Sequence, residues 1–185
     1  MVKDILKQAE DKMNKAVEVV RQELVKIRTG KATTALLDGV KVEYYGSEVP
    51  LKQVANVSVL DVHTISIQPW EKNMISTVEK AIIGSNLGLN PVSDGTVVRV
   101  PIPPLNEERR HDLVKLVKKF AEEGKVAVRN VRRDAIEHLK KSEKAEHFSE
   151  DERKRGEAEA QKMTDKHIKD IDNLVAMKEK EIMEV

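Results

Sequence analysis

The residues from Asn106 to Lys144 predict one uninterrupted α-helix, and this stretch constrains the fold more than any other. A helix of about 39 residues is about 58 Å long at 1.5 Å per residue. Apolar residues recur along it at spacings of three and four, the pattern of a helix that buries one face. It cannot bury that face alone, so it must pack against other long helices. The predicted apolar seam is Leu113, Leu116, Phe120, Gly124, Ala127, Val131, Ala135 and Leu139.

Two further long helices are predicted, one on each side in the sequence. Residues 3–28 form the first, and Thr29-Gly30 ends it because glycine tolerates the left-handed backbone that terminates helices. After a break at His147-Phe148, a capping box at Ser149 and Glu152 starts another helix that runs to the C-terminus. The predicted stripes are Leu6, Ala9, Met13, Ala16, Val20, Leu24 and Ile27, and then Ala160, Met163, Ile168, Ile171, Leu174, Val175 and Ile182.

The segment between the first two helices has a different character. Its charge is less dense, and several of its runs alternate apolar and polar residues, as half-buried strands do. We expect a small mixed α/β domain of about 70 residues, a size that can fold by itself. Its predicted strands are residues 40–45, 57–59, 63–68 and 96–100, and its predicted helix is residues 73–85.

The two connections to this segment lie at the same end of the predicted bundle. The first is Thr29-Gly30, and the second is rich in proline, which can continue neither a helix nor a sheet. Two connections at one point predict a hinge, formed by Thr29, Gly30, Lys31, Pro101, Pro103, Pro104 and Leu105. The predicted class is α+β: an elongated three-helix bundle (residues 1–30 and 105–185) with a small mixed α/β domain (residues 31–104) inserted between its first and second helices.

Composition excludes several classes of protein. Charged residues make up 35% of the chain and aromatic residues 3%, which favours solvent-facing helices over a sandwich or barrel. The chain has no cysteine, which excludes disulfides and thiolate chemistry and suits a reducing, cytoplasmic compartment. No apolar run approaches the length of about 20 residues that a membrane-spanning helix needs. We therefore expect no membrane association.

The candidate chemical groups do not predict an enzyme. No histidine lies in an HExxH motif or another paired metal spacing, and no Ser/His/Asp group can be recognised. We expect no metal, no cofactor and no catalytic activity of the chain itself. The histidines are His63, His111, His138, His147 and His167.

The net charge of +1 hides an uneven distribution. From residue 109 to 133 the chain has nine basic and three acidic residues, whereas residues 149–185 have eight basic and eleven acidic residues. Lys125, Arg129, Arg132 and Arg133 follow steps of four, three and one, which places them on adjoining turns of one helix face. Two interpretations stay open: a solvated flank with ion pairs, or a surface for the phosphates of structured RNA, which arginine binds in bidentate fashion.

Several motifs resemble the ribosome recycling factor family of bacteria, over nearly the whole chain. The most specific of them is the run from Val126 to Asp134. The others are Lys26-Ile27-Arg28-Thr29-Gly30-Lys31-Ala32, Val42-Glu43-Tyr44-Tyr45-Gly46, Val78-Glu79-Lys80-Ala81-Ile82, Leu87-Gly88-Leu89-Asn90-Pro91, Pro101-Ile102-Pro103-Pro104-Leu105 and Glu107-Glu108-Arg109-Arg110.

This resemblance implies an L-shaped molecule of about the size of tRNA, and a function. Such a factor acts with elongation factor G and GTP to disassemble the ribosome after termination, and it binds chiefly to large-subunit rRNA. The resemblance also implies that Arg28, Arg110, Arg129 and Arg132 face that RNA and that the factor works as a cytoplasmic monomer. The alternative from another class is a helical adaptor or coiled-coil protein that uses its seams to bind a protein partner.

Overall fold

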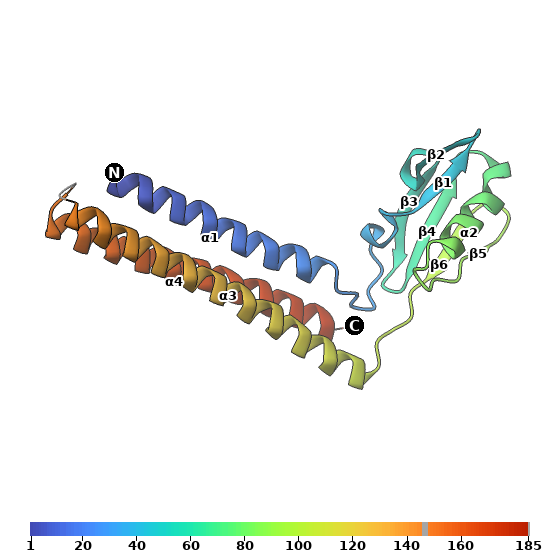
Figure 1. Ribbon diagram of the computed structural model, residues 1–185. Helices are drawn as coiled ribbons and strands as arrows, with labels where there is room; N and C mark the ends of the chain where they lie inside the picture. The colour runs from blue at the N-terminus through green and yellow to red at the C-terminus, as the bar shows by residue number, and fades with distance from the viewer. Residues whose placement is uncertain (146–147, 185) are drawn as a thin grey trace. The chain divides into compact units, whose positions relative to one another are not determined.

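The computed structural model describes residues 1–145 and 148–184, so His147 of the predicted break lies outside the described residues. The chain divides into two compact units, one of residues 1–28 and 107–184 and the other of residues 29–106. The first unit consists of three long helices (Figure 1), which are α1 (Val2–Val25), α3 (Glu107–Lys144) and α4 (Glu150–Met183).

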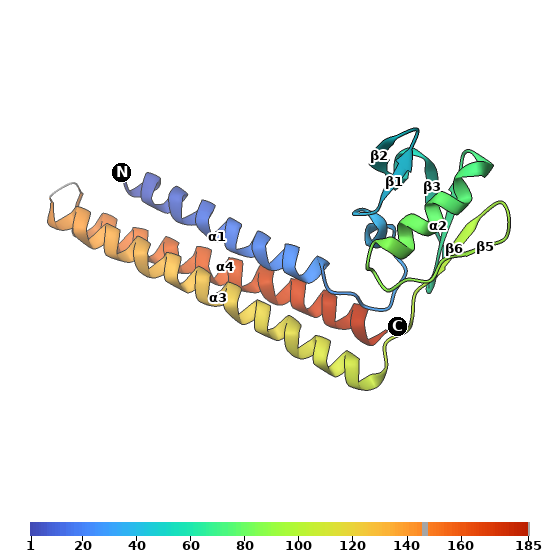
Figure 2. The ribbon, with the colours of Figure 1, turned by 45° about the vertical axis from the view of Figure 1, so that its right-hand side comes forward.

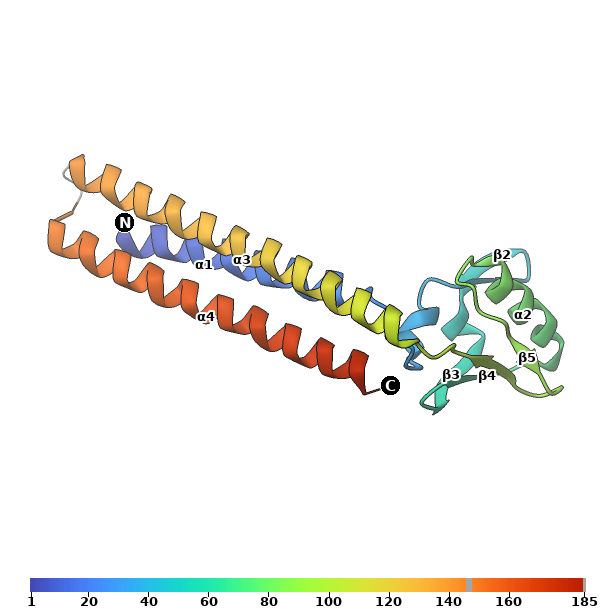
Figure 3. The ribbon, with the colours of Figure 1, turned by 90° about the horizontal axis from the view of Figure 1, so that it is seen from below.

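The three helices pack side by side, as two further views agree (Figures 2 and 3), and α3 and α4 extend beyond the N-terminal end of the shorter α1. The fold class expected from the sequence, α+β with a bundle of long helices, is confirmed. Helix α1 ends at Val25, three residues earlier than expected. The backbone N–H of Ile27 donates to the carbonyl of Leu24, so the chain tightens into a turn before it reaches Arg28.

The buried faces are broader than the predicted single stripes, because each helix contacts two others. In α3, Leu116, Phe120, Ala127 and Val131 are only half-buried. The residues that α3 buries instead include Val117, Ala121 and Val128. In α1, the buried residues include Ile5 and Val17, which were not part of the predicted stripe, whereas Leu6 and Ala16 of that stripe are not fully buried. In α4, two polar residues are part of the buried set, which is Gly156, Ala160, Thr164, His167, Ile171 and Ile182.

Gly124 lets α1 and α3 approach each other closely, as its place on the predicted seam indicated. A Cβ atom built at this position would lie 2.2 Å from Cγ2 of Val20. That distance is far inside van der Waals contact, so the packing of Val20 against α3 requires a residue without a side chain. The cost of glycine in a helix interior, about 1 kcal/mol, is offset by this close packing.

The predicted capping box begins α4. The backbone N–H of Glu152 donates to Oγ of Ser149 at 3.3 Å, and Oε2 of Glu152 accepts from the backbone N–H of Ser149 at 2.9 Å. The hydrogen bond from Ser149 holds the pKa of the Glu152 carboxyl below its usual range. Two backbone N–H groups that a helix start leaves without partners are thereby satisfied.

Ser149→Ala is expected to lower the free energy of unfolding of the bundle by about 1 kcal/mol, because it removes this cap. Ser149→Asp keeps a side-chain oxygen in the same place and is expected to retain most of the stability. Thermal unfolding followed by far-UV circular dichroism measures both variants. Equal losses in the two variants would show that the cap contributes little.

The second unit is built from short elements, and all of its strand pairs are antiparallel. Strands β1 and β2 form a hairpin, and the other four form a sheet in the order β3-β4-β6-β5. The elements are the 3-10 helices η1 (Thr34–Leu37), η2 (Leu51–Gln53) and η3 (Lys72–Met74), the helix α2 (Ile75–Gly84), and the strands β1 (Lys41–Tyr44), β2 (Ser47–Pro50), β3 (Ala55–Asp61), β4 (Thr64–Pro69), β5 (Val92–Ser93) and β6 (Val98–Pro101).

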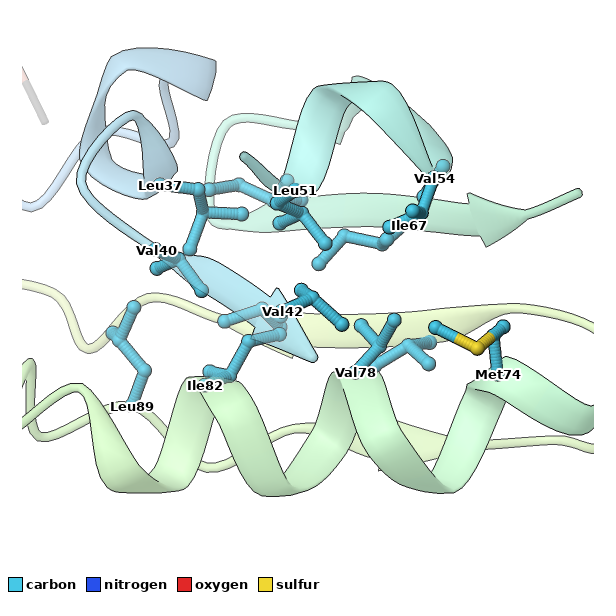
Figure 4. Close-up of a cluster of buried hydrophobic side chains, with 14 of the residues drawn as sticks. Leu37, Val40, Val42, Leu51, Val54, Ile67, Met74, Val78, Ile82 and Leu89 are labelled. Carbon is cyan, nitrogen blue, oxygen red and sulfur yellow. The ribbon is translucent and has the colours of Figure 1, made fainter. Parts of the chain in front are cut away.

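Helix α2 and the strands enclose one apolar core. Figure 4 shows Val42 of β1 directed toward Val78 and Ile82 of α2, with Met74 and Leu89 at the two ends of the cluster. Val42, Val78 and Ile82 are completely buried. Burial of a single side chain of this size contributes roughly 1.5–3 kcal/mol. The unit thus has a core of its own, independent of the bundle.

Candidate nucleic-acid interface

All six basic residues predicted to bind RNA belong to the bundle unit, but they form two groups. Lys125, Arg129, Arg132 and Arg133 lie within about 12 Å of one another along the axis of α3. Arg110 is in the first turn of α3, about 22 Å from Lys125 by the same rise per residue, and Arg28 follows the end of α1. The sequence pattern therefore corresponds to one compact basic cluster on α3 and two arginines near the bundle end where the chain leaves it.

Helix α4 supplies partners that inspection of α3 alone could not identify. Nζ of Lys125 lies 2.5 Å from a carboxylate oxygen of Asp172, and Nη1 of Arg132 donates to Oε1 of Gln161 at 3.0 Å. Asp172 and Gln161 are both on α4. Lys125 and Arg132 thus lie on the flank of α3 that faces α4, and the acidic α4 neutralises part of the positive charge of α3.

Arg129 and Arg133 are placed differently from these two residues. Nη1 of Arg129 donates to Oε1 of Glu122 at 2.9 Å, within α3 itself. Arg133 is exposed and has no ion pair with any residue in the described part of the chain. An exposed pair such as Arg129 with Glu122 contributes about 0–1 kcal/mol, so an RNA phosphate can replace the glutamate at small cost.

The side chains of Arg110 and Arg132 are half-buried. Their Nε atoms are covered by protein and have no hydrogen-bond partner among the described residues. A guanidinium packed in this way has already lost much of its rotamer freedom, so less entropy is lost when its remaining N–H groups bind a phosphate. With Nε covered, only the Nη groups of these two arginines are left for a phosphate, whereas Nζ of Lys125 is engaged by a carboxylate.

The predicted hinge residues all fall within residues 29–106, on the side of the smaller unit. Gly30 has a φ of +75°, which favours glycine. A Cβ atom at Gly30 would lie 3.1 Å from the backbone nitrogen of Leu105 and 3.2 Å from its Cγ. The two connections between the units therefore touch each other, and Gly30 is required both by its backbone conformation and by this contact.

Sequence reasoning missed an aromatic cluster on the β1–β2 hairpin. The hydroxyl groups of Tyr44 and Tyr45 donate to the two carboxylate oxygens of Glu71 at 2.9 and 3.3 Å. Tyr45 has a φ of +48° and is 80% exposed. Glu43 and Glu48 face each other across the hairpin, where like charges repel. The sequence signal was present in the adjacent tyrosines before Gly46, but no pattern indicated that a distant glutamate joins them.

A histidine is buried inside the bundle. Nδ1 of His167 lies 2.6 Å from the carbonyl oxygen of Met163, and its Nε2 lies 2.8 Å from Oδ1 of Asn14 on α1. Only 1% of His167 is exposed. Both ring nitrogens have partners, as buried polar groups require. This histidine ties α4 to α1 and is part of the core rather than of a catalytic site.

The described residues offer little for other chemistry. Within residues 1–145 and 148–184, no group of three or more His, Asp or Glu side chains is arranged to hold a metal ion. No helix in that part of the chain is both long enough and apolar enough to cross a membrane.

A shallow groove between α1 and α3 is mostly apolar and is lined by residues that include Val19, Phe120 and Ala127.

Fold and site together define a helical bundle protein with an inserted antiparallel unit and a basic cluster on its central helix. Residues 20–183 match the model of the family described as ribosome recycling factor. The chain is 57% identical to the ribosome-recycling factor of Symbiobacterium thermophilum and 56% identical to that of Neisseria gonorrhoeae, in both cases over 100% of each chain. The chain belongs to the ribosome recycling factor family.

Similar proteins are also found among solved structures. A solution structure of the ribosome recycling factor is 50% identical and has a TM-score of 0.78, with 100% of this chain and 98% of that chain covered. A T. thermophilus ribosome recycling factor, described together with E. coli elongation factor G bound to the E. coli post-termination complex, is 49% identical and has a TM-score of 0.64. In this second case the match covers 98% of each chain.

Proposed function

We propose that this chain, acting with elongation factor G and GTP, disassembles the post-termination ribosome and frees it from mRNA. The match to the family over residues 20–183 carries this proposal. The related factor described with elongation factor G on the post-termination complex supports the same partners. In this proposal the chain works as a cytoplasmic monomer and hydrolyses nothing itself; the GTP is consumed by the elongation factor.

The bundle is the part proposed to hold the large ribosomal subunit. The RNA contacts are assigned to the basic cluster on α3 and to the two arginines near the bundle end, which are Arg28, Arg110, Lys125, Arg129, Arg132 and Arg133. The chain is nearly neutral overall, so its attraction to rRNA has to come from this local charge. Half-buried arginines beside an exposed one suit a surface that binds the RNA backbone by shape.

The seams of the three long helices are buried against one another. Met13, Val117 and Ile171, one from each helix, are completely buried. They are therefore not available to a partner helix, which argues against the adaptor function.

Breakdown of polysomes to single ribosomes and subunits, measured on a sucrose gradient, tests the proposed function. The breakdown should require the chain, elongation factor G and GTP together. Breakdown that is the same without the chain would contradict the proposed function.

The smaller unit is proposed to take the push of the elongation factor and to move about the two connections. A disulfide between two introduced cysteines, one in each connection, should leave ribosome binding nearly intact but slow subunit splitting strongly. The native chain has no cysteine, so the two introduced cysteines can pair only with each other within the chain. Splitting is measured by light scattering and binding by co-sedimentation.

The same double variant under reducing conditions is the matched control for the disulfide. Reduction should restore the rate of subunit splitting that the double variant had before the disulfide formed, because reduction breaks this disulfide and changes nothing else. Equal loss of binding and splitting in the oxidised protein would argue against a hinge role for these connections.

A further inference from the structure

One short turn of the smaller unit holds both connections to the bundle unit. Val62 and His63 form the turn between β3 and β4. The carbonyl of Val62 accepts a hydrogen bond from the backbone N–H of Ala32 at 2.7 Å, and the carbonyl of His63 accepts one from the N–H of Ile102 at 2.6 Å. Successive carbonyls of the turn thus bind the incoming and the outgoing connection.

The side chain of His63 adds a third contact, which reaches farther along the incoming connection. Its Nδ1 lies 3.1 Å from the carbonyl oxygen of Gly30. A carbonyl can only accept, so Nδ1 carries the proton and donates it to this bond. Gly30 in turn packs against Leu105 of the outgoing connection. The histidine therefore immobilises the point at which the two connections touch.

The turn is itself rigid, so it can serve as an anchor. Oδ1 of Asp61 accepts from the backbone N–H of His63 at 2.8 Å, and this bond holds the pKa of the Asp61 carboxyl below its usual range. Strand β4, which follows the turn, is paired on both sides, with β3 and with β6. Its residues Ile65 and Ile67 are completely buried. The turn is therefore fixed to the core of the smaller unit.

We propose that the Val62–His63 turn is a clasp that shortens both connections, and that His63 is the positioning residue that limits how far the two units move relative to each other. The clasp holds Gly30 and Ala32 of the incoming connection and Ile102 of the outgoing connection to the smaller unit. Its role in subunit splitting rests on the proposed function. A force that the elongation factor applies to the smaller unit reaches the bundle only if the connections between the units do not bend first.

Without the side chain of His63, the first residue of the incoming connection that is held to the turn becomes Ala32 instead of Gly30. The part of this connection that the turn does not hold should then lengthen from about one residue to about three. Since the reach of a flexible segment grows with the square root of its length, the spread of distances between the units should widen about 1.7-fold. His63→Asn places an amide donor where Nδ1 lies and should keep the native spread. His138→Ala is the matched control, because His138 is an exposed histidine on α3.

The experiment uses the full chain with spin labels on cysteines introduced at Ser93 and Ala158, which are exposed positions in the two units. Pulsed electron spin resonance then gives the distance distribution for each variant. A wider distribution in His63→Ala alone is the expected result. Equal widths in His63→Ala and in the native protein would overturn the clasp, as would an equal widening in His63→Asn.

Subunit splitting by the same variants separates this proposal from the proposed function. His63→Ala should bind ribosomes as tightly as the native chain and split them more slowly, with His63→Asn restoring the rate. A wider distribution with an unchanged splitting rate would overturn the positioning role. A native chain that splits no ribosomes would contradict the proposed function, whereas the clasp is decided by the distance distribution in the free protein.

Discussion

Arg132→Glu is expected to weaken binding to the large ribosomal subunit by roughly tenfold or more. A charge-assisted hydrogen bond contributes about 1.5–3 kcal/mol, and about 1.4 kcal/mol corresponds to a factor of ten in affinity. The introduced carboxylate also repels the RNA phosphates. Arg132 is half-buried and held by Gln161, so its guanidinium is already positioned in the free protein. Co-sedimentation with isolated large subunits measures the affinity.

The salt dependence of this binding distinguishes a phosphate contact from a loss of folding. The slope of log affinity against log salt should become shallower by about one when one phosphate contact is lost. Lys166→Glu makes the same change in charge at an exposed position of α4 and should leave the affinity nearly unchanged. If Arg132→Glu is folded and binds as tightly as the native chain, the basic cluster on α3 is not the RNA surface.

Gly124→Val is expected to destabilise the bundle by about 3 kcal/mol, the upper part of the range for overpacked cores. Its Cβ atom alone would lie 2.2 Å from Val20, whose side chain is 2% exposed and cannot move into solvent. The two helices would have to separate along their contact. Chemical denaturation followed by far-UV circular dichroism measures the change in the free energy of unfolding.

Two further variants test whether the clash with Val20 is the cause. Adding Val20→Ala to Gly124→Val should restore part of the lost stability, with a coupling energy of about 1–3 kcal/mol. Gly84→Val makes the same substitution in α2, where a Cβ atom would meet nothing within 4 Å, and should change stability little. Additive losses in the double variant would show that Gly124 is needed for another reason.

The long helices could be predicted because their signals are local. The capping box at Ser149 and the proline-rich run before α3 mark helix ends directly in the sequence. The seam of α3 was predicted only in part. A single stripe describes a helix with one neighbour, but α3 packs against two, so Val117 and Val128 are buried while Leu116 faces partly outward.

The smaller unit could be predicted less completely, because its elements depend on distant contacts. Strand β2 (Ser47–Pro50) has no apolar alternation and ends in a proline. It exists because it pairs with β1 across the turn at Tyr45 and Gly46. Strand β5 has two residues and pairs only with β6. Such short elements carry too little pattern to be recognised from the sequence.

The candidate site shows the same division between local and distant signals. The cluster of arginines on α3 was evident from their spacing in the sequence. The pairing of Lys125 with Asp172 was not, because these residues are 47 positions apart on different helices. The contact between His63 and Gly30 likewise joins two segments that no sequence period relates.

Light scattering of purified post-termination ribosomes tests the central claim most directly. Addition of the chain with elongation factor G and GTP should lower the scattering as ribosomes separate into subunits. The decrease should disappear when either protein is left out or when GTP is replaced by an analogue that cannot be hydrolysed. Scattering that stays constant with all three components present, or falls equally without the chain, would contradict the claim that this protein splits ribosomes.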